Sequence, residues 1–296
     1  MPSDLTRRRF LQTTALAVAS CYLPSQQAEA QQKREFQVSL SASSLARSIN
    51  ERKIDHLDLA NIARTKYSIA AVEYASKFFS DKARDEKYLN DMNKRAADEG
   101  VRQLLIVVNS EGCIGHPEEP KRQQTVKNHH KWIDAAKALG CHSIEINPCG
   151  IGGNADQLKQ AAEGIAALCE YAERQKINIL LGSYGGVSAN PKWLVELVRT
   201  VNRVSCGTLP SFDGFGSHDR YDGVAKLLPF AKGIGATARN FDGNGNEPNT
   251  DYFRMMKVVL DGGYRGYVGI NYQGNEMEEA AGIRATKTLL KKIQAS

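Results

Sequence analysis

The stretch Ile-Asn-Ile-Leu-Leu-Gly-Ser-Tyr-Gly-Gly, residues 177–186, decides the fold. Its first half consists mainly of Ile and Leu, which predicts a short strand buried on both faces, as in parallel sheets covered by helices. The apolar run then breaks at Gly182, Ser183 and Tyr184. In an eight-stranded barrel this break lies at the carboxyl end of a central strand, where barrel enzymes place their chemistry. None of the three residues is a good ligand for a divalent metal or a good general base.

Apolar runs alternate with amphipathic segments on both sides of this stretch. We expect the other strands at residues 36–40, 69–74, 103–109, 141–147, 204–209, 233–238 and 266–272. We expect helices at residues 57–66, 85–99, 121–139, 155–175 and 278–293, and one beginning near Pro191. Strands and helices in close alternation imply parallel pairing through right-handed crossovers. The sequence therefore predicts an α/β fold, a single-domain (β/α)8 TIM barrel over residues 36–296.

An open, doubly wound sheet is the alternative architecture. Such a sheet would usually carry a Gly-rich phosphate-binding turn after its first strand. Here residues 40–44 are rich in serine, and neither a GxGxxG nor a P-loop motif occurs in the chain. The sequence therefore favours the barrel.

The amino terminus reads as an export signal. Residues 6–12, Thr-Arg-Arg-Arg-Phe-Leu-Gln, resemble a twin-arginine signal, and a modestly apolar run follows. Ala28-Glu29-Ala30 has the form of a cleavage site, which predicts a signal at residues 1–30 and a polar linker at 31–35. Alternatively, residues 18–21 resemble a lipoprotein box, in which case Cys21 carries a lipid anchor. Both readings place the protein in the periplasm or cell envelope, and no other stretch is long and apolar enough to span a bilayer.

The charge pattern argues against nucleic acid as a partner. The chain has a formal net charge of +6, but its Lys and Arg are interspersed with Asp and Glu. No basic stripe with interleaved aromatic residues occurs. Nothing in the sequence indicates an oligomeric state.

The strand ends supply the candidate site. Because these ends meet at one edge of a barrel, we expect their polar side chains to lie together. The candidates for substrate binding are Asn109, Asn147, Tyr184, Ser211, Arg239, Asn271 and Gln273. The candidates for acid–base chemistry are Glu145 and Glu73 as bases, with His218 or Asp213 as their partner. Hydroxyls, amides and aromatic rings suit a carbohydrate, because they exchange hydrogen bonds with hydroxyls and present flat faces to sugar rings.

Several segments together resemble one family. They are Ala-Val-Glu-Tyr at 71–74, Asn-His-His-Lys-Trp-Ile-Asp-Ala-Ala at 128–136, Gly-Cys-His-Ser-Ile at 140–144, Cys-Gly-Thr-Leu-Pro at 206–210, Asp-Arg-Tyr at 219–221 and Gly-Tyr-Val-Gly-Ile at 266–270. Over nearly all of residues 36–294 the chain resembles the xylose isomerase-like barrels, also called sugar phosphate isomerase/epimerases. The resemblance implies a divalent metal held by Glu, Asp, His and Glu from the fifth to eighth strands. That metal polarises a hydroxy-carbonyl unit while carboxylates move a proton between neighbouring carbons.

The four ligand positions implied by the resemblance carry other residues here. They fall on Gly182, Ser211, Asn271 and, on or near the seventh-strand position, Gly235. None of these supplies the carboxylate or imidazole that such cations prefer. We therefore predict no cofactor, with Mn²⁺, Mg²⁺ or Zn²⁺ only if Asp213, His218 and Glu145 rebuild a site.

Three functions remain open from the sequence. The first is an exported barrel that binds a carbohydrate or sugar-like ligand without isomerising it in the manner of the family. The second is an active sugar isomerase/epimerase, or a metal-free carbohydrate-modifying enzyme, with a rebuilt site. The third is a scaffold that binds a partner through its surface.

Overall fold

The computed structural model describes residues 36–150 and 154–296. The expected export signal, the linker and Cys21 lie outside these residues. Residues Phe36–Ser296 form one compact unit. Within the described part of the chain, no helix has the length and apolar character needed to cross a membrane.

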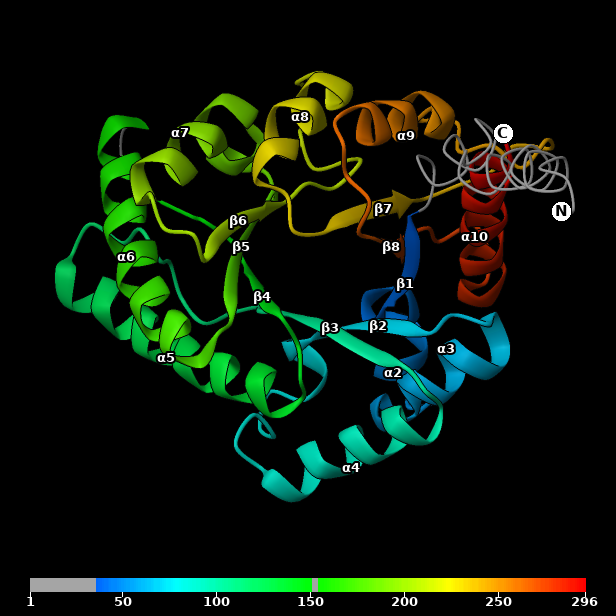
Figure 1. The fold of residues 1–296 in the computed structure, drawn as a ribbon, viewed down its shortest axis with the longest axis horizontal. Coiled ribbons are helices and arrows are strands. Elements are labelled where there is room, and N and C mark those ends of the chain that lie inside the picture. The colour runs from blue at the N-terminus through cyan, green and yellow to red at the C-terminus, as the bar shows by residue number, and fades with distance from the viewer. Residues whose placement is uncertain (1–35, 151–153) are drawn as a thin grey trace, which may run out of the picture. The chain divides into compact units, whose positions relative to one another are not determined.

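Parallel strands form a sheet that curls into a barrel, as the sequence predicts (Figure 1). In the described residues the sheet is eight-stranded, with the order β6-β5-β4-β3-β2-β1-β8-β7. The strands are β1 (Gln37–Ser41), β2 (Ala71–Ala75), β3 (Arg102–Val107), β4 (Ser143–Ile146), β5 (Asn178–Gly182), β6 (Cys206–Leu209), β7 (Ile234–Ala238) and β8 (Tyr267–Tyr272). A parallel bridge between Ser211 and Gly235 connects the chain after β6 to β7, with Phe212 N to Gly235 O at 3.0 Å. This bridge brings the two outer strands of the sheet together.

Helices surround the strands and cover the outer face of the sheet (Figure 1). The α-helices are α2 (Ala46–Asn50), α3 (Leu59–Tyr67), α4 (Glu86–Asp98), α5 (Glu119–Ala138), α6 (Asn154–Gln175), α7 (Pro191–Val201), α8 (Arg220–Leu227), α9 (Tyr252–Asp261) and α10 (Glu279–Ala295). Short 3₁₀ turns are η1 (Ala42–Leu45), η2 (His56–Asp58), η3 (Ser76–Phe78), η4 (Gly186–Ala189) and η5 (Leu228–Phe230). The cap of α7 is typical: Asn190 Oδ1 accepts from Lys192 N at 3.0 Å, and Pro191 occupies the first turn.

The alternation of side chains along the strands divides the core into two layers. Residues such as Ile144, Ile179 and Val268 pack outward against the helices. A smaller cluster, which includes Leu105, Leu180 and Leu209, fills the interior of the barrel. Because side chains alternate along a strand, the residue two positions after an interior residue again faces inward. The interior of the barrel is therefore apolar at the level of these leucines. The inward-facing positions nearer the carboxyl ends of the strands carry the polar groups described below.

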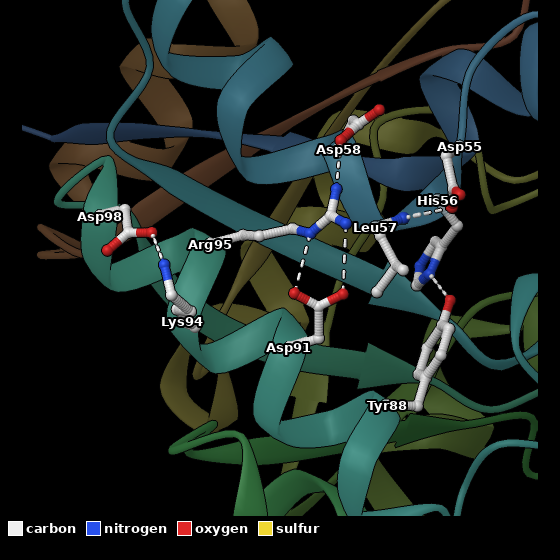
Figure 2. A network of polar contacts seen from close by, with 9 residues as sticks. All are labelled: Asp55, His56, Leu57, Asp58, Tyr88, Asp91, Lys94, Arg95 and Asp98. Atoms are coloured by element: carbon white, nitrogen blue, oxygen red, sulfur yellow. Dashed lines mark hydrogen bonds and ion pairs between the residues drawn. The ribbon is translucent and has the colours of Figure 1, made fainter.

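A polar network connects the start of α3 to α4 (Figure 2). The guanidinium of Arg95 donates to Asp91 at 3.0 and 3.2 Å through two nitrogens and to Asp58 at 2.5 Å. Nearby, His56 Nδ1 lies 3.1 Å from the Tyr88 hydroxyl. The ion pairs around Arg95 are partly exposed, so each is worth about 1 kcal/mol or less. This network orients the outer helices and lies away from the strand ends.

Candidate functional site

A cavity of about 500 Å³ opens at the carboxyl ends of the strands, and we call it the main cavity. Hydroxyl and amide side chains dominate its wall. They are Ser41, Ser43, Asn109, Ser183, Ser211, Thr237, Asn271 and Gln273. Charged or ionisable groups reach it as well, from Glu73, Lys77, Glu145, Asp213 and Arg239. The main cavity thus offers many hydrogen-bond donors and acceptors to a ligand.

Glu73 is one of two acids buried inside the barrel. It lies on β2 and accepts a hydrogen bond of 2.6 Å from Ser39 Oγ on the neighbouring strand. Its carboxyl group packs against Gly269 of β8, where any Cβ would overlap it. Burial raises the pKa of Glu73 to about 7, although the hydrogen bond from Ser39 opposes this effect. Near neutral pH the group is therefore present in both protonation states.

Glu145, the second buried acid, lies on β4 and faces the main cavity. Its carboxyl group occupies the space above Gly182: a Cβ on Gly182 would overlap both Glu145 Oε1 and the ring of Tyr184. Burial raises the pKa of Glu145 to about 8, the Tyr184 hydroxyl lowers it through a hydrogen bond, and the charge of Glu73 raises it further. At neutral pH Glu145 is thus mainly a neutral carboxylic acid, which can donate as well as accept a hydrogen bond.

Tyr184 is directed into the barrel mouth by the turn that follows β5. Gly185 and Gly186 adopt positive φ values of 91° and 56°, which glycine adopts readily. The Ser188 hydroxyl closes the turn, accepting from Tyr184 N at 3.0 Å and donating to Gly185 O at 2.8 Å. The Tyr184 residue remains 44% exposed at the mouth even though its hydroxyl reaches Glu145. The residues that follow β5 therefore place the aromatic ring of Tyr184 in the wall of the main cavity.

The part of the mouth next to β5 carries a chain of polar contacts that runs from the end of β6 to the end of β7. Ser211 Oγ lies 2.7 Å from Thr237 Oγ1 and donates to Asp213 Oδ1 at 3.2 Å. Asp213 Oδ2 accepts from Arg239 at 2.9 Å through Nη2 and at 3.2 Å through Nε. The Asp213 carboxylate is therefore engaged, and it does not stand free as a general base.

Three oxygens near the main cavity are buried without a partner in the described part of the chain. They are Asn109 Oδ1, Ser183 Oγ and Asn271 Oδ1. Leaving a buried polar atom unpaired costs about 1–3 kcal/mol, so native proteins usually pair such atoms with protein, water or ligand. None of the three is accessible to solvent, so these oxygens lie behind the cavity wall and not on its surface.

The structure brings together most of the residues predicted from the sequence. The residues that line the main cavity are Glu73, Asn109, Glu145, Tyr184, Ser211, Asp213, Arg239, Asn271 and Gln273. Two do not line it. Asn147 is exposed just beyond β4 and lines a neighbouring chamber of about 490 Å³, which we call the side chamber. His218 is exposed in the turn before α8, so the expected pairing of His218 with Glu145 is not formed.

Several cavity residues were not among the predicted candidates. Ser41, Ser43 and Lys77 follow β1 and β2, where the serine-rich run at residues 41–44 was the available signal. His129, which lines the side chamber, comes from the middle of α5 and has no strand-end signal at all.

The four metal-ligand positions implied by the family resemblance surround the main cavity. Ser211, Gly235 and Asn271 line it, Gly182 lies beneath Glu145 and Tyr184, and none of the four carries a carboxylate or an imidazole. At Gly182 the nearest acid is Glu145, which is buried and hydrogen-bonded to Tyr184. Among the residues that the structure describes, no group of three or more His, Cys, Asp and Glu side chains could hold a metal ion.

Comparisons with known proteins find the same fold in several solved structures. No curated protein matches the sequence. The solved D-psicose 3-epimerase from Clostridium cellulolyticum H10, with D-tagatose, superposes with a TM-score of 0.68 at 12% identity, covering 88% of this chain and 96% of that one. The IOLI protein with a binding zinc atom superposes with a TM-score of 0.69 at 13% identity, covering 88% of this chain and 98% of that one. The 3-keto-D-glucoside 4-epimerase from E. coli superposes with a TM-score of 0.66 at 11% identity, covering 87% of this chain and 100% of that one. At these identities the likeness concerns the fold.

A family model agrees with the likeness in fold. The model described as the xylose isomerase-like TIM barrel matches residues 59–213, more than half of the chain. The chain belongs to the xylose isomerase-like TIM barrel family.

Proposed function

We propose that this barrel binds a neutral carbohydrate in the main cavity without the divalent metal of its family. One observation carries the proposal: the main cavity, at the carboxyl ends of the strands, is walled mainly by hydroxyl and amide side chains. A sugar presents hydroxyl donors all around its ring, so it can form hydrogen bonds with several of these side chains at once. The size of the cavity, about 500 Å³, falls in the range of small-molecule sites.

The donor chemistry does not fit a divalent cation held in the family's manner. Hard cations such as Mg²⁺ and Mn²⁺ take anionic oxygen ligands, and Zn²⁺ takes imidazole, thiolate or carboxylate. Here the positions offer two glycines, the Ser211 hydroxyl and the Asn271 amide. The space above Gly182 is filled by Glu145 and Tyr184, so a carboxylate cannot simply be restored there. These residues therefore do not fit a catalytic step that runs through a metal held in the family's manner.

Relatives of the same fold support a sugar as the ligand. Two of them are D-psicose 3-epimerases, one solved with D-tagatose and one in the presence of D-fructose. Because identity to these proteins is only 12%, the proposed class of ligand rests on the lining of the cavity itself.

Thermal unfolding with and without sugars tests the proposal. The chain, freed of metal by a chelator, is heated with a panel of neutral monosaccharides at millimolar concentrations. A bound sugar should raise the Tm in proportion to the logarithm of its concentration, and added Mn²⁺ should not change this shift. A shift that appears only when metal is present would contradict the proposal. A scaffold, the remaining alternative from the sequence, predicts no shift with any sugar and a protein that co-purifies.

A second candidate function, metal-free proton transfer on the bound sugar, is favoured by the two buried acids. Burial places the pKa of Glu73 at about 7 and that of Glu145 at about 8, close to the pH at which an acid–base catalyst works best. One carboxylate would accept a proton from a carbon beside a carbonyl group, and a carboxylic acid would return a proton to the neighbouring position.

Sugar turnover distinguishes this candidate from simple binding. Nuclear magnetic resonance of ketoses incubated with the protein in D₂O reports epimerisation, isomerisation and exchange of the carbon-bound proton. A metal-free enzyme should show a bell-shaped pH profile and lose activity in Glu145→Gln. Binding without any exchange would leave the first proposal standing alone.

We also propose that the chain is exported through its twin-arginine signal, which rests on residues 6–12 and Ala28-Glu29-Ala30 alone. Mass spectrometry of the mature protein from its native cell tests this. A chain beginning at Gln31 supports cleavage after Ala30, and a lipid-modified Cys21 supports anchoring instead. An intact amino terminus in the cytoplasm would contradict export.

A further inference from the structure

The side chamber lies next to the main cavity, and Tyr184 and Asn109 line both. The two chambers are similar in volume, about 490 and 500 Å³. The Tyr184 ring and Asn109 therefore border both chambers. The walls of the side chamber also include Glu111, His129 and Asn147.

His129 presents a hydrogen-bond acceptor to the side chamber. The residue is only 5% exposed, and its Nδ1 lies 2.8 Å from the carbonyl oxygen of Thr125. Since a carbonyl can only accept, Nδ1 carries the proton, and in the neutral ring Nε2 is left with its lone pair. Burial lowers the pKa of His129, which keeps the ring neutral. No described residue makes a hydrogen bond to Nε2. This nitrogen can therefore accept a hydrogen bond from a ligand.

The side chamber also holds no uncompensated charge. Its acid, Glu111, lies 2.8 Å from the Lys131 ammonium and accepts a hydrogen bond of 2.7 Å from Trp132 Nε1. These two contacts fix the Glu111 carboxylate against α5 and neutralise it. Asn109, which is uncharged, also lines the chamber, and its backbone N–H donates to Ser76 Oγ at 2.8 Å. The chamber therefore suits a neutral group that donates hydrogen bonds.

We propose that the side chamber is a second sugar subsite, so that the ligand of this protein is a neutral sugar of two rings, with one ring in the main cavity and the other beside His129 and Asn147. The inference rests on the proposed function, since it assigns the first ring to the main cavity. It adds a residue from a helix, His129, to a site otherwise built from strand ends. It also explains why the aromatic ring of Tyr184 stands exposed between the two chambers.

Titration calorimetry of the full chain with one-ring and two-ring sugars tests the inference. Glucose and galactose serve as one-ring probes, and maltose, cellobiose and lactose as two-ring probes. At least one two-ring sugar should bind at least tenfold more tightly than the one-ring sugar it contains. Equal affinities for one-ring and two-ring sugars would overturn the inference and leave the proposed function intact. Failure of every probe to bind would reject both.

Variants assign the second ring to the side chamber. His129→Phe keeps the ring size and removes the acceptor, so two-ring binding should weaken about 2- to 12-fold, the effect of one neutral hydrogen bond, while one-ring binding stays unchanged. The matched control is His130→Phe on the same helix, where the ring stacks on Tyr171 at 3.7 Å outside the chamber. Asn147→Ala, at an exposed position, repeats the test if His129→Phe does not fold. Equal losses for one-ring and two-ring sugars in these variants would contradict the assignment.

Discussion

Gly182 on β5 and Gly235 on β7 are separated by a single strand, β6, yet the space above them differs. Above Gly182, on what we call the closed side, the Glu145 carboxyl and the Tyr184 ring take the room that a side chain would need. Above Gly235, on the open side with Ser211 and Asn271, the nearest atom to an added Cβ is Ser211 Cβ at 3.5 Å, an ordinary contact.

The difference shows that the lack of a side chain has two distinct structural consequences. On the closed side, neighbours fill the space, and one of them is a desolvated acid beside a tyrosine. On the open side, the space has stayed in the cavity, walled by hydroxyl and amide groups. The closed side should therefore govern stability and its pH dependence, and the open side should govern binding.

The largest expected effect is on the pH dependence of stability. The folded pKa values of Glu73 and Glu145, about 7 and 8, lie above the ordinary value of 4.5, so the folded chain keeps protons that the unfolded chain releases. Stability should therefore fall as the pH rises from about 5 to about 8, by a few kcal/mol in all. In Glu145→Gln, the unfolding free energy measured with urea should stop falling near pH 7, because Glu73 is then the remaining buried acid of the pair and has lost its proton.

The surface variant Glu51→Gln is the control for this measurement, because Glu51 is fully exposed. Its pH profile should follow that of the wild type. A Glu145→Gln profile identical to the wild type above pH 7 would show that Glu145 is ionised in the folded protein, and the closed side would then lack its neutral acid.

A smaller effect is expected when each glycine receives one methyl group. Gly182→Ala forces the Glu145 carboxyl and the Tyr184 ring aside and should cost about 1–3 kcal/mol of unfolding free energy, the usual range for overpacking. Gly235→Ala meets only ordinary contacts and should change stability by less than about 1 kcal/mol. Chemical denaturation measures both. Equal losses in the two variants would remove the distinction between the sides.

The smallest effect concerns ligand binding on the open side. Asn271→Ala removes an amide from the cavity wall and should weaken binding of the sugar found by thermal unfolding about 2- to 12-fold, as expected for one hydrogen bond. Gln273→Ala is the matched control, because Gln273 is exposed and its amide oxygen already faces Arg239 at 3.5 Å. Calorimetry should show less than about a twofold change for the control. A larger loss of affinity in Gln273→Ala than in Asn271→Ala would show that the sugar binds at the exposed rim of the cavity and not beside Asn271.

The sequence predicts the fold well because barrel strands have a strong local signal. Apolar runs such as residues 177–181 are buried on both faces, and each expected strand overlaps an observed one. Helices α8 and α9 were not predicted. Helix α8 has only eight residues and contains Gly223, a poor helix former, and α9 follows a loop rich in Gly and Asn. The buried residues of α9 nevertheless recur at helical spacing from Tyr252 to Val259, so its sequence does contain a helix signal.

The site is predictable only where the strands themselves aim the side chains. Glu73 and Glu145 lie within strands, so alternation fixes their inward direction. Asn147 and His218 lie beyond strand ends, where the loop decides the direction, and neither reaches the main cavity. Tyr184 turns inward through the positive φ values of Gly185 and Gly186, and His129 reaches the side chamber from a helix. Tertiary packing sets these last placements, and no local pattern encodes them.

The central claim is that the mouth of this barrel accepts a sugar while its own residues supply no cage for a cation. Elemental analysis of the protein purified without chelator, followed by calorimetric titration with Mn²⁺ and Zn²⁺, tests this claim most directly. The account predicts less than about one tenth of an equivalent of metal per chain and no saturable binding at micromolar concentrations. One tightly bound ion per chain, lost in Glu145→Gln, would contradict it.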